Sequence, residues 1–119
     1  MSKEDYNSNL NRRLEEQKWL EDIISKSGYC LLCGYNDNPL IIERHHIAGK
    51  NNSDITIPVC PICHRILSNK QLSWDKRWMN KENSDKTKMA FVLRGQSEVL
   101  GLMAKTQKEL SEKILNGEI

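Results

Sequence analysis

The sequence predicts a small α+β domain that is held together by a four-cysteine metal site and flanked by two helices. The chain has 119 residues, which fits one domain with a modest core. All four cysteines fall in two CxxC pairs with two short β-branched runs between them, and longer helical patterns lie towards the two ends. We therefore expect a single domain, 1–119, made of an N-terminal helix (1–28), a metal-stapled core (29–70) and a basic, aromatic segment with a C-terminal helix (71–119).

The N-terminal part has the pattern of an amphipathic helix. Apolar residues recur at helical spacing from Leu10 to Ile24, charged residues separate them, and Gly28 follows. The first residues lack the apolar stretch of a signal peptide, and no apolar run in the chain approaches the roughly 18 residues that span a bilayer. These features predict a soluble, cytoplasmic protein without a membrane partner.

The cysteines predict a structural zinc site. Cys30 and Cys33 form one knuckle, Cys60 and Cys63 form the other, and 26 residues separate them. Four thiolates supplied by two CxxC turns satisfy the tetrahedral preference of Zn²⁺. A thioredoxin-like dithiol is the alternative, but two pairs without a βαβ pattern disfavour it. Four thiolates leave no open position on the ion, so this zinc would clamp the chain and take no part in chemistry.

The segment between and after the knuckles predicts strand, loop, strand and helix. LIIERHHI (40–47) and ITIPVC (55–60) are the predicted strands, AGKNNSD (48–54) is the loop, and HRILSNKQL (64–72) is a short helix. Adjacent residues of a strand point to opposite faces, so His45 and His46 can share a site only if the strand ends or distorts there. Gly49 permits the sharp turn that this requires.

A long C-terminal helix is predicted from Ser84, a plausible N-cap, to a stop at Gly117. Gly95 and Gly101 each weaken such a helix by about 1 kcal/mol relative to alanine, so packing must support it. Its apolar stripe either packs on the N-terminal helix or forms the seam of a homodimer. The stripe consists of Met89, Val92, Leu93, Val99, Leu100, Met103, Leu110 and Ile114.

All three histidines lie beside this predicted clamp. The run RHHIAGKNNSDITIPVCPICHRIL (44–67) places His45 and His46 at the end of the first strand and His64 directly after Cys63. Since the zinc would hold both the hairpin and the helix start, the three imidazoles can converge. Each could instead be structural: His45 buried and hydrogen-bonded, or His64 at a helix cap.

The combination CxxC, HHI and CxxCH resembles the HNH nucleases of the ββα-metal (His-Me finger) superfamily, in their zinc-knuckle form. The resemblance implies a ββα-metal core and an endonuclease that hydrolyses phosphodiester bonds, nicking or cutting DNA. It implies that His46 is the general base and that His45 and His64 hold a catalytic divalent ion, Mg²⁺ or Mn²⁺. The family has asparagine at the position of Ile55, and we expect Asn52 or Asp54 to fix the loop instead. A non-catalytic zinc-ribbon module that binds nucleic acid is the alternative function.

The basic residues predict contact with the phosphate backbone of DNA. The formal net charge is only +2, but residues 65–81 hold five Lys/Arg against one Asp, and such clustering favours phosphate binding. Trp74 and Trp78 lie one helical turn apart and could stack on bases or belong to the core. The candidate nucleic-acid-binding residues are Arg44, Lys50, Arg65, Lys76 and Arg77.

Overall fold

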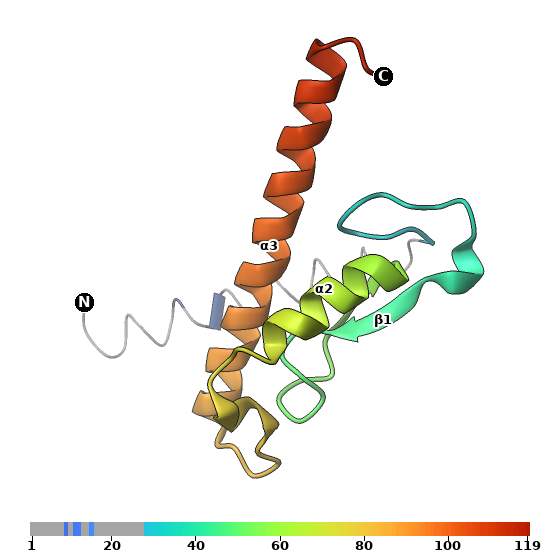
Figure 1. Cartoon of the computed structure of the whole chain (residues 1–119). Helices are drawn as coiled ribbons and strands as arrows, with labels where there is room; N and C mark the ends of the chain where they lie inside the picture. The colour runs from blue at the N-terminus through green and yellow to red at the C-terminus, as the bar shows by residue number, and fades with distance from the viewer. Residues whose placement is uncertain (1–8, 10, 13–14, 16–27) are drawn as a thin grey trace.

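The computed structural model describes residues 9, 11–12, 15 and 28–119. The predicted N-terminal helix therefore lies almost wholly outside the described residues. The rest confirms a small α+β fold with a two-stranded antiparallel sheet and two α-helices (Figure 1). In chain order the elements are η1 (Pro39–Ile41), β1 (Glu43–His46), β2 (Thr56–Val59), α2 (Pro61–Gln71), η2 (Lys76–Met79) and α3 (Asp85–Leu115).

The hairpin is shorter than the sequence pattern predicts. Asn38 and Pro39 start a 3-10 turn, with the Asn38 side chain accepting a hydrogen bond from Leu40 N, so β1 begins only at Glu43. β1 ends at His46, which pairs with Thr56. The chain then turns, and Gly49 adopts the left-handed conformation at φ 84°. β1 thus stops one residue before the predicted end, and His46 is still paired within it.

Helix α2 begins at Pro61, three residues before the predicted start. Cys60 is its N-cap, and the Cys60 sulfur accepts a hydrogen bond from Cys63 N at 3.4 Å. Proline at the first helical position fits because its missing N–H would have no helical partner there. The second knuckle is therefore both a pair of thiols and the first turn of a helix that packs on β1, β2 and α3.

Helix α3 has the predicted boundaries. One of its glycines, Gly95, is required by packing although glycine is a poor helix former. Ser84 caps it by accepting from Thr87 N, and Gly117 follows it at φ 72°. A Cβ placed on Gly95 would lie 1.8 Å from the Ile47 carbonyl oxygen. Only glycine lets α3 approach the backbone of the turn after β1 so closely.

The segment between the two helices completes the core. Trp74 is 5% exposed and stacks on Phe91, with ring centroids 6.1 Å apart, and the edge of Trp78 packs against it. Trp74 belongs to the core and cannot stack on a base, whereas Trp78 is partly buried against it. Their packing attaches η2 to α3.

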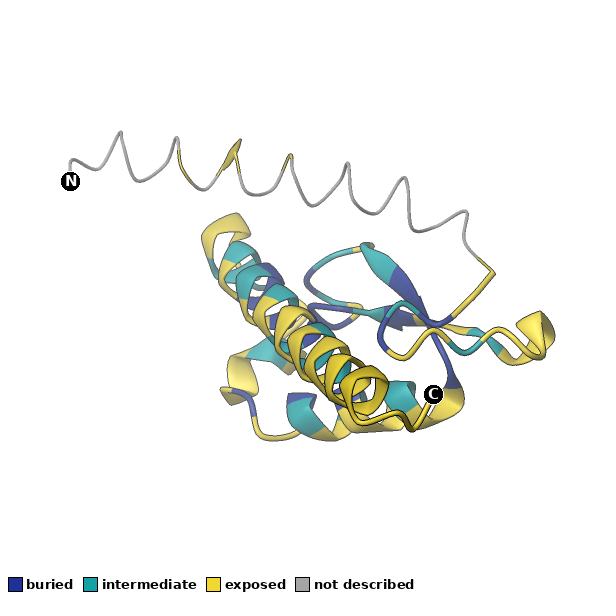
Figure 2. Ribbon diagram, turned by 90° about the horizontal axis from the view of Figure 1, so that it is seen from above, coloured by how far each residue is buried: buried dark blue, intermediate teal, exposed yellow. Residues whose placement is uncertain are grey.

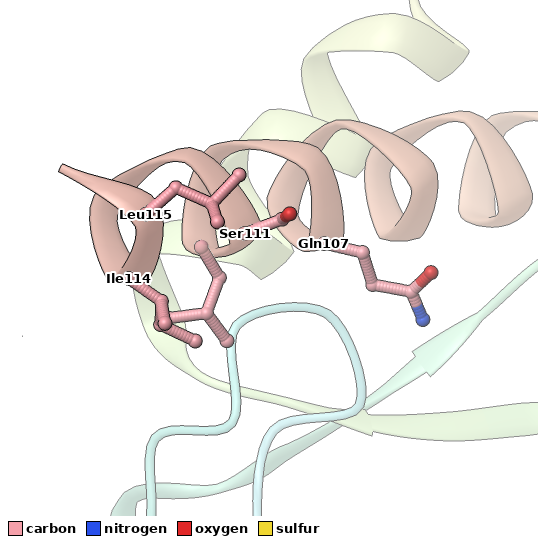
Figure 3. A pocket seen from close by; sticks show the side chains of 5 residues that line it. Gln107, Ser111, Ile114 and Leu115 are labelled. Atoms are coloured by element: carbon pink, nitrogen blue, oxygen red, sulfur yellow. The ribbon is translucent and has the colours of Figure 1, made fainter.

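The C-terminal end of α3 is exposed (Figure 2). Leu110 and Ile114, with neighbouring side chains, line an open pocket of about 320 Å³ (Figure 3). This pocket holds no histidine, cysteine or carboxylate. Nothing in the described residues covers this end of the stripe, so both packing on the N-terminal helix and a homodimer seam stay predictions. In the described part of the chain, no helix combines the length and the apolar character needed to cross a membrane.

Candidate functional site

The four cysteines converge at the base of the hairpin and could hold a metal ion. Their sulfur atoms all lie within 4.8 Å of one another, although Cys30 and Cys60 come from segments 30 residues apart. The sulfurs of Cys33 and Cys60 are 3.8 Å apart. Tetrahedral zinc with Zn–S bonds of about 2.3 Å separates its sulfurs by about 3.8 Å. The predicted cysteine cluster is confirmed, and its geometry fits zinc.

The protonation chemistry of the cluster also suits a cation. Burial raises the pKa of the Cys63 thiol, and the neighbouring Cys60 and Cys30 sulfurs raise it further. Burial likewise raises the pKa of Cys33. Burial also acts on Cys30, but backbone hydrogen bonds outweigh it and lower the pKa of this thiol. Neighbouring thiolates repel one another, and a divalent cation removes that repulsion. Metal binding here would release protons and become stronger as pH rises.

The structure brings His45 and His64 together. His45 lies near the end of β1 and His64 in the first turn of α2, and their ring centroids are 5.2 Å apart in an edge-to-face arrangement. The imidazole of His46, the last residue of β1, is only partly buried. No set of three histidine or carboxylate side chains among the described residues converges as tightly as the cysteines do.

His45 lies in a dry environment. Its side chain is buried, and burial, followed by the charges of His64 and His46, lowers its pKa to about 4. The ring is therefore neutral at pH 7. Its Nε2 faces Gln71 Nε2 at 3.4 Å. Since an amide nitrogen only donates, Gln71 directs an N–H at the lone pair of His45 Nε2, so this nitrogen is a hydrogen-bond acceptor in the structure.

Asn52 fixes the loop between the strands. Its amide nitrogen donates to Ala48 O and to Trp78 O, each at 2.8 Å, and its oxygen accepts from Asn83 Nδ2 at 2.9 Å. The side chain is buried. Of the two residues expected to fix the loop in place of Ile55, Asn52 makes these bonds, while Asp54 is exposed.

Two residues that the sequence-based prediction omits contact the histidines directly. Glu43 forms a charge-assisted hydrogen bond to Nδ1 of His64. Gln71, in the last turn of α2, donates to the His46 carbonyl oxygen at 2.9 Å. Glu43 was detectable, because it stands two residues before His45 and alternate strand residues share a face. Gln71 gave no comparable signal.

The five candidate nucleic-acid-binding residues are all exposed and come from four elements or turns. Arg44 lies on β1, Lys50 in the turn after it, Arg65 on α2, and Lys76 and Arg77 on η2. Arg65 directly follows His64. The Arg77 guanidinium donates to both carboxylate oxygens of Asp75, at 3.0 and 2.7 Å. That pairing offsets the positive charge that Arg77 would present to a phosphate.

No protein-family model, curated protein or solved structure matches this chain. Any assignment of function therefore depends on the side chains described above.

Proposed function

We propose that this protein is a metal-dependent endonuclease of the HNH type that hydrolyses phosphodiester bonds in DNA. The observation that carries the proposal is the edge-to-face contact of His45 and His64, 5.2 Å between centroids, beside the four-cysteine cluster. One imidazole comes from β1 and the other from the first turn of α2, so the ββα unit itself brings them together. The resemblance to HNH nucleases implies the same pair as metal ligands.

In this proposal His45 and His64 hold a catalytic Mg²⁺ or Mn²⁺. When bound, the ion would polarise the scissile phosphate and stabilise the charge on the departing 3′-oxygen. Neutral imidazole is the ligand form of histidine, and the low pKa of His45, about 4, keeps that ring neutral at pH 7.

His46 acts as the general base. Its ring is partly accessible, as a group that takes a proton from water must be, and histidine is the side chain that most often serves as a general base. Two groups donate to the carbonyl oxygen of His46: the side-chain amide of Gln71 at 2.9 Å and Gly49 N at 3.2 Å. Two donors on one carbonyl fix the end of the strand that carries the base.

The cysteine cluster acts as the structural zinc site of this nuclease. Zinc bound to Cys30, Cys33, Cys60 and Cys63 would join the knuckle before β1 to the N-cap of α2. The backbone supports the same junction, since Leu31 N donates to Pro58 O at 2.9 Å and His64 N donates to Cys60 O at 2.8 Å. Exposed Arg44, Lys50 and Arg65 would contact the DNA backbone near the histidines.

A non-catalytic nucleic-acid-binding module is the second candidate. It is favoured by the burial of His45 and by the Gln71 amide facing its Nε2 at 3.4 Å. A histidine with only that role would be structural. The two candidates share the zinc site and the basic surface, and they differ only in whether the histidines perform chemistry.

The test is a plasmid-nicking assay with zinc-loaded protein, with and without added Mn²⁺ or Mg²⁺. We expect metal-dependent nicking that leaves 5′-phosphate and 3′-hydroxyl ends. His46→Ala should lower turnover by roughly 10² to 10⁴-fold, the usual worth of general-base catalysis, while DNA affinity and zinc content stay unchanged.

Ligand substitutions should behave differently from loss of the base. His45→Ala and His64→Ala should raise the Mn²⁺ concentration needed for half-maximal nicking. Lys108→Ala, on the exposed end of α3, is the matched control and should cut like the wild type. Wild-type protein that binds DNA but never cuts it would assign the binding module. Nicking that survives His46→Ala would remove His46 from the mechanism.

A further inference from the structure

Glu43 and His45 lie on the same face of β1, the face that meets α2. They are two residues apart on the strand, and both contact His64, Glu43 through its carboxylate and His45 through its ring. Glu43 therefore approaches one side of the His64 imidazole while His45 lies against the ring. Three side chains of metal-ligating chemistry meet at this junction of strand and helix.

The contact between Glu43 and His64 has a definite chemical consequence for the imidazole. The carboxylate oxygen accepts from Nδ1, so the ring proton is held on Nδ1 and the lone pair is left on Nε2. A histidine that binds a metal through one nitrogen commonly donates from the other to a carboxylate, which fixes its tautomer and makes it a stronger ligand.

The same contact contributes little to the stability of the fold. The Glu43 side chain is 47% exposed and that of His64 is 30% exposed. A contact this exposed adds little stability, because water competes for both groups and ordering the side chains costs entropy. Since the fold gains so little from this pair, a role in orienting the ring explains its placement better than a role in stability does.

We propose that Glu43 is a positioning residue that holds His64 in the Nδ1–H tautomer, with Nε2 directed to a hard divalent cation such as Mn²⁺. This inference deepens the proposed function and rests on it. Glu43 acts through His64 and is not itself a ligand of the ion, and its effect should disappear when His64 is absent.

The first experiment needs neither a metal nor a substrate. The chain has only three histidines, so a long-range ¹H–¹⁵N spectrum of the zinc-loaded protein can report the tautomer of each ring. At alkaline pH, where imidazoles are neutral, wild-type His64 should be the Nδ1–H form. Glu43→Ala should move His64 toward the Nε2–H form that free histidine prefers. Glu43→Gln, whose amide oxygen can still accept from Nδ1, should keep most of the wild-type signal.

The second experiment is a double-mutant cycle on Mn²⁺ affinity, measured by electron paramagnetic resonance of zinc-loaded protein. Glu43→Ala should raise the Mn²⁺ dissociation constant by about 10- to 100-fold. In the His64→Ala background the same change should have less than about a twofold effect, because the group through which Glu43 acts is gone. Glu109→Ala removes an equal charge from the exposed end of α3 and should leave the affinity unchanged.

The outcomes separate this inference from the proposed function. A tautomer of His64 that does not respond to Glu43→Ala overturns the inference even if the protein is a nuclease. Additive effects of Glu43→Ala and His64→Ala also overturn it, because they would make Glu43 a ligand in its own right. Wild-type protein with the Nδ1–H tautomer but no Mn²⁺ binding overturns the assignment of an ion to this site. Mn²⁺ binding with the predicted coupling but no nicking supports the inference and refutes only the nuclease.

Discussion

Replacing Gly95 by alanine tests how closely α3 must approach the turn that follows β1. The new Cβ would lie 1.8 Å from the Ile47 carbonyl oxygen and 2.5 Å from the Ile47 carbonyl carbon. Both are backbone atoms of a residue that is 2% exposed, so no side chain can rotate to relieve the clash. An ordinary contact between such atoms lies near about 3.5 Å, so either α3 or the turn must shift by more than about 1 Å to relieve the clash.

The cost of that shift exceeds what alanine gains as a helix former. Overpacking a core typically destabilises by about 1 to 3 kcal/mol, and by more when the obstacle is rigid. Alanine recovers about 1 kcal/mol of helix propensity. We expect Gly95→Ala to lower the free energy of unfolding by about 2 kcal/mol or more, which lowers the Tm of a domain of this size by about 6 to 12 °C.

Gly101→Ala is the matched control for this measurement. It lies in the same helix, and a Cβ there would meet nothing within 4 Å among the described residues. It should stabilise the protein by up to about 1 kcal/mol. Thermal and urea unfolding of both variants, with zinc present, would give the comparison. A Gly95→Ala protein as stable as the wild type would refute the close approach of α3 to the turn.

Four further predictions concern the metal, the loop, the buried histidine and the basic surface. Purified protein should hold about one zinc ion per chain, and Cys60→Ser or a strong chelator should unfold the hairpin, as circular dichroism and metal analysis would show; a folded, zinc-free protein contradicts the clamp. Asn52→Ala should lower the free energy of unfolding by about 2 to 4 kcal/mol, because buried carbonyls lose their donor. Asn51→Ala removes one exposed hydrogen bond to Met79 and should lower it by under about 1 kcal/mol. Equal effects would argue against Asn52 as the residue that fixes the loop. His45 has a pKa of about 4 in the folded protein and about 6.5 when unfolded, so the unfolded state binds more protons between these values. The wild type should therefore lose about 3 kcal/mol of stability as pH falls from about 6.5 to 4, and His45→Gln should lack this loss. Parallel pH profiles of the two proteins would refute the burial of a neutral ring. DNA affinity should fall steeply with salt, and Arg65→Ala should reduce that slope; a slope identical to that of the wild type would place the phosphate contacts elsewhere.

Local patterns predicted those parts of the molecule whose partners are close in sequence. Each CxxC pair forms a knuckle because its spacing alone sets the turn, and Ser84 and Gly117 mark the ends of α3 because capping involves only neighbouring residues. The sequence predicts a helix at the second knuckle, and the structure begins it three residues earlier than the predicted segment, at Pro61. The same residues serve as a metal turn and as a helix N-terminus.

Contacts between distant segments could not be predicted in the same way. Asn52 was one of two residues expected to fix the loop, and only the position of Trp78, 26 residues later, selects it. The propensity of Gly95 indicates a weak point in a helix, whereas the structure shows that the missing side chain is what lets Ile47 come near. Gln71 reaches His46 across 25 residues, and no local pattern marks it.

The placement of the two knuckles also bears on how the hairpin is stabilised. The hairpin and two of the three histidines lie in the loop between Cys33 and Cys60, and the third follows Cys63 directly. Closing a loop of this length with a cross-link reduces the entropy of the unfolded chain by an amount worth about 3 to 4 kcal/mol. Without a bound ion, the packing of two four-residue strands against the helices must offset this entropy. Zinc bound as proposed above would therefore stabilise the hairpin, and the placement of the imidazoles would depend on the supply of zinc.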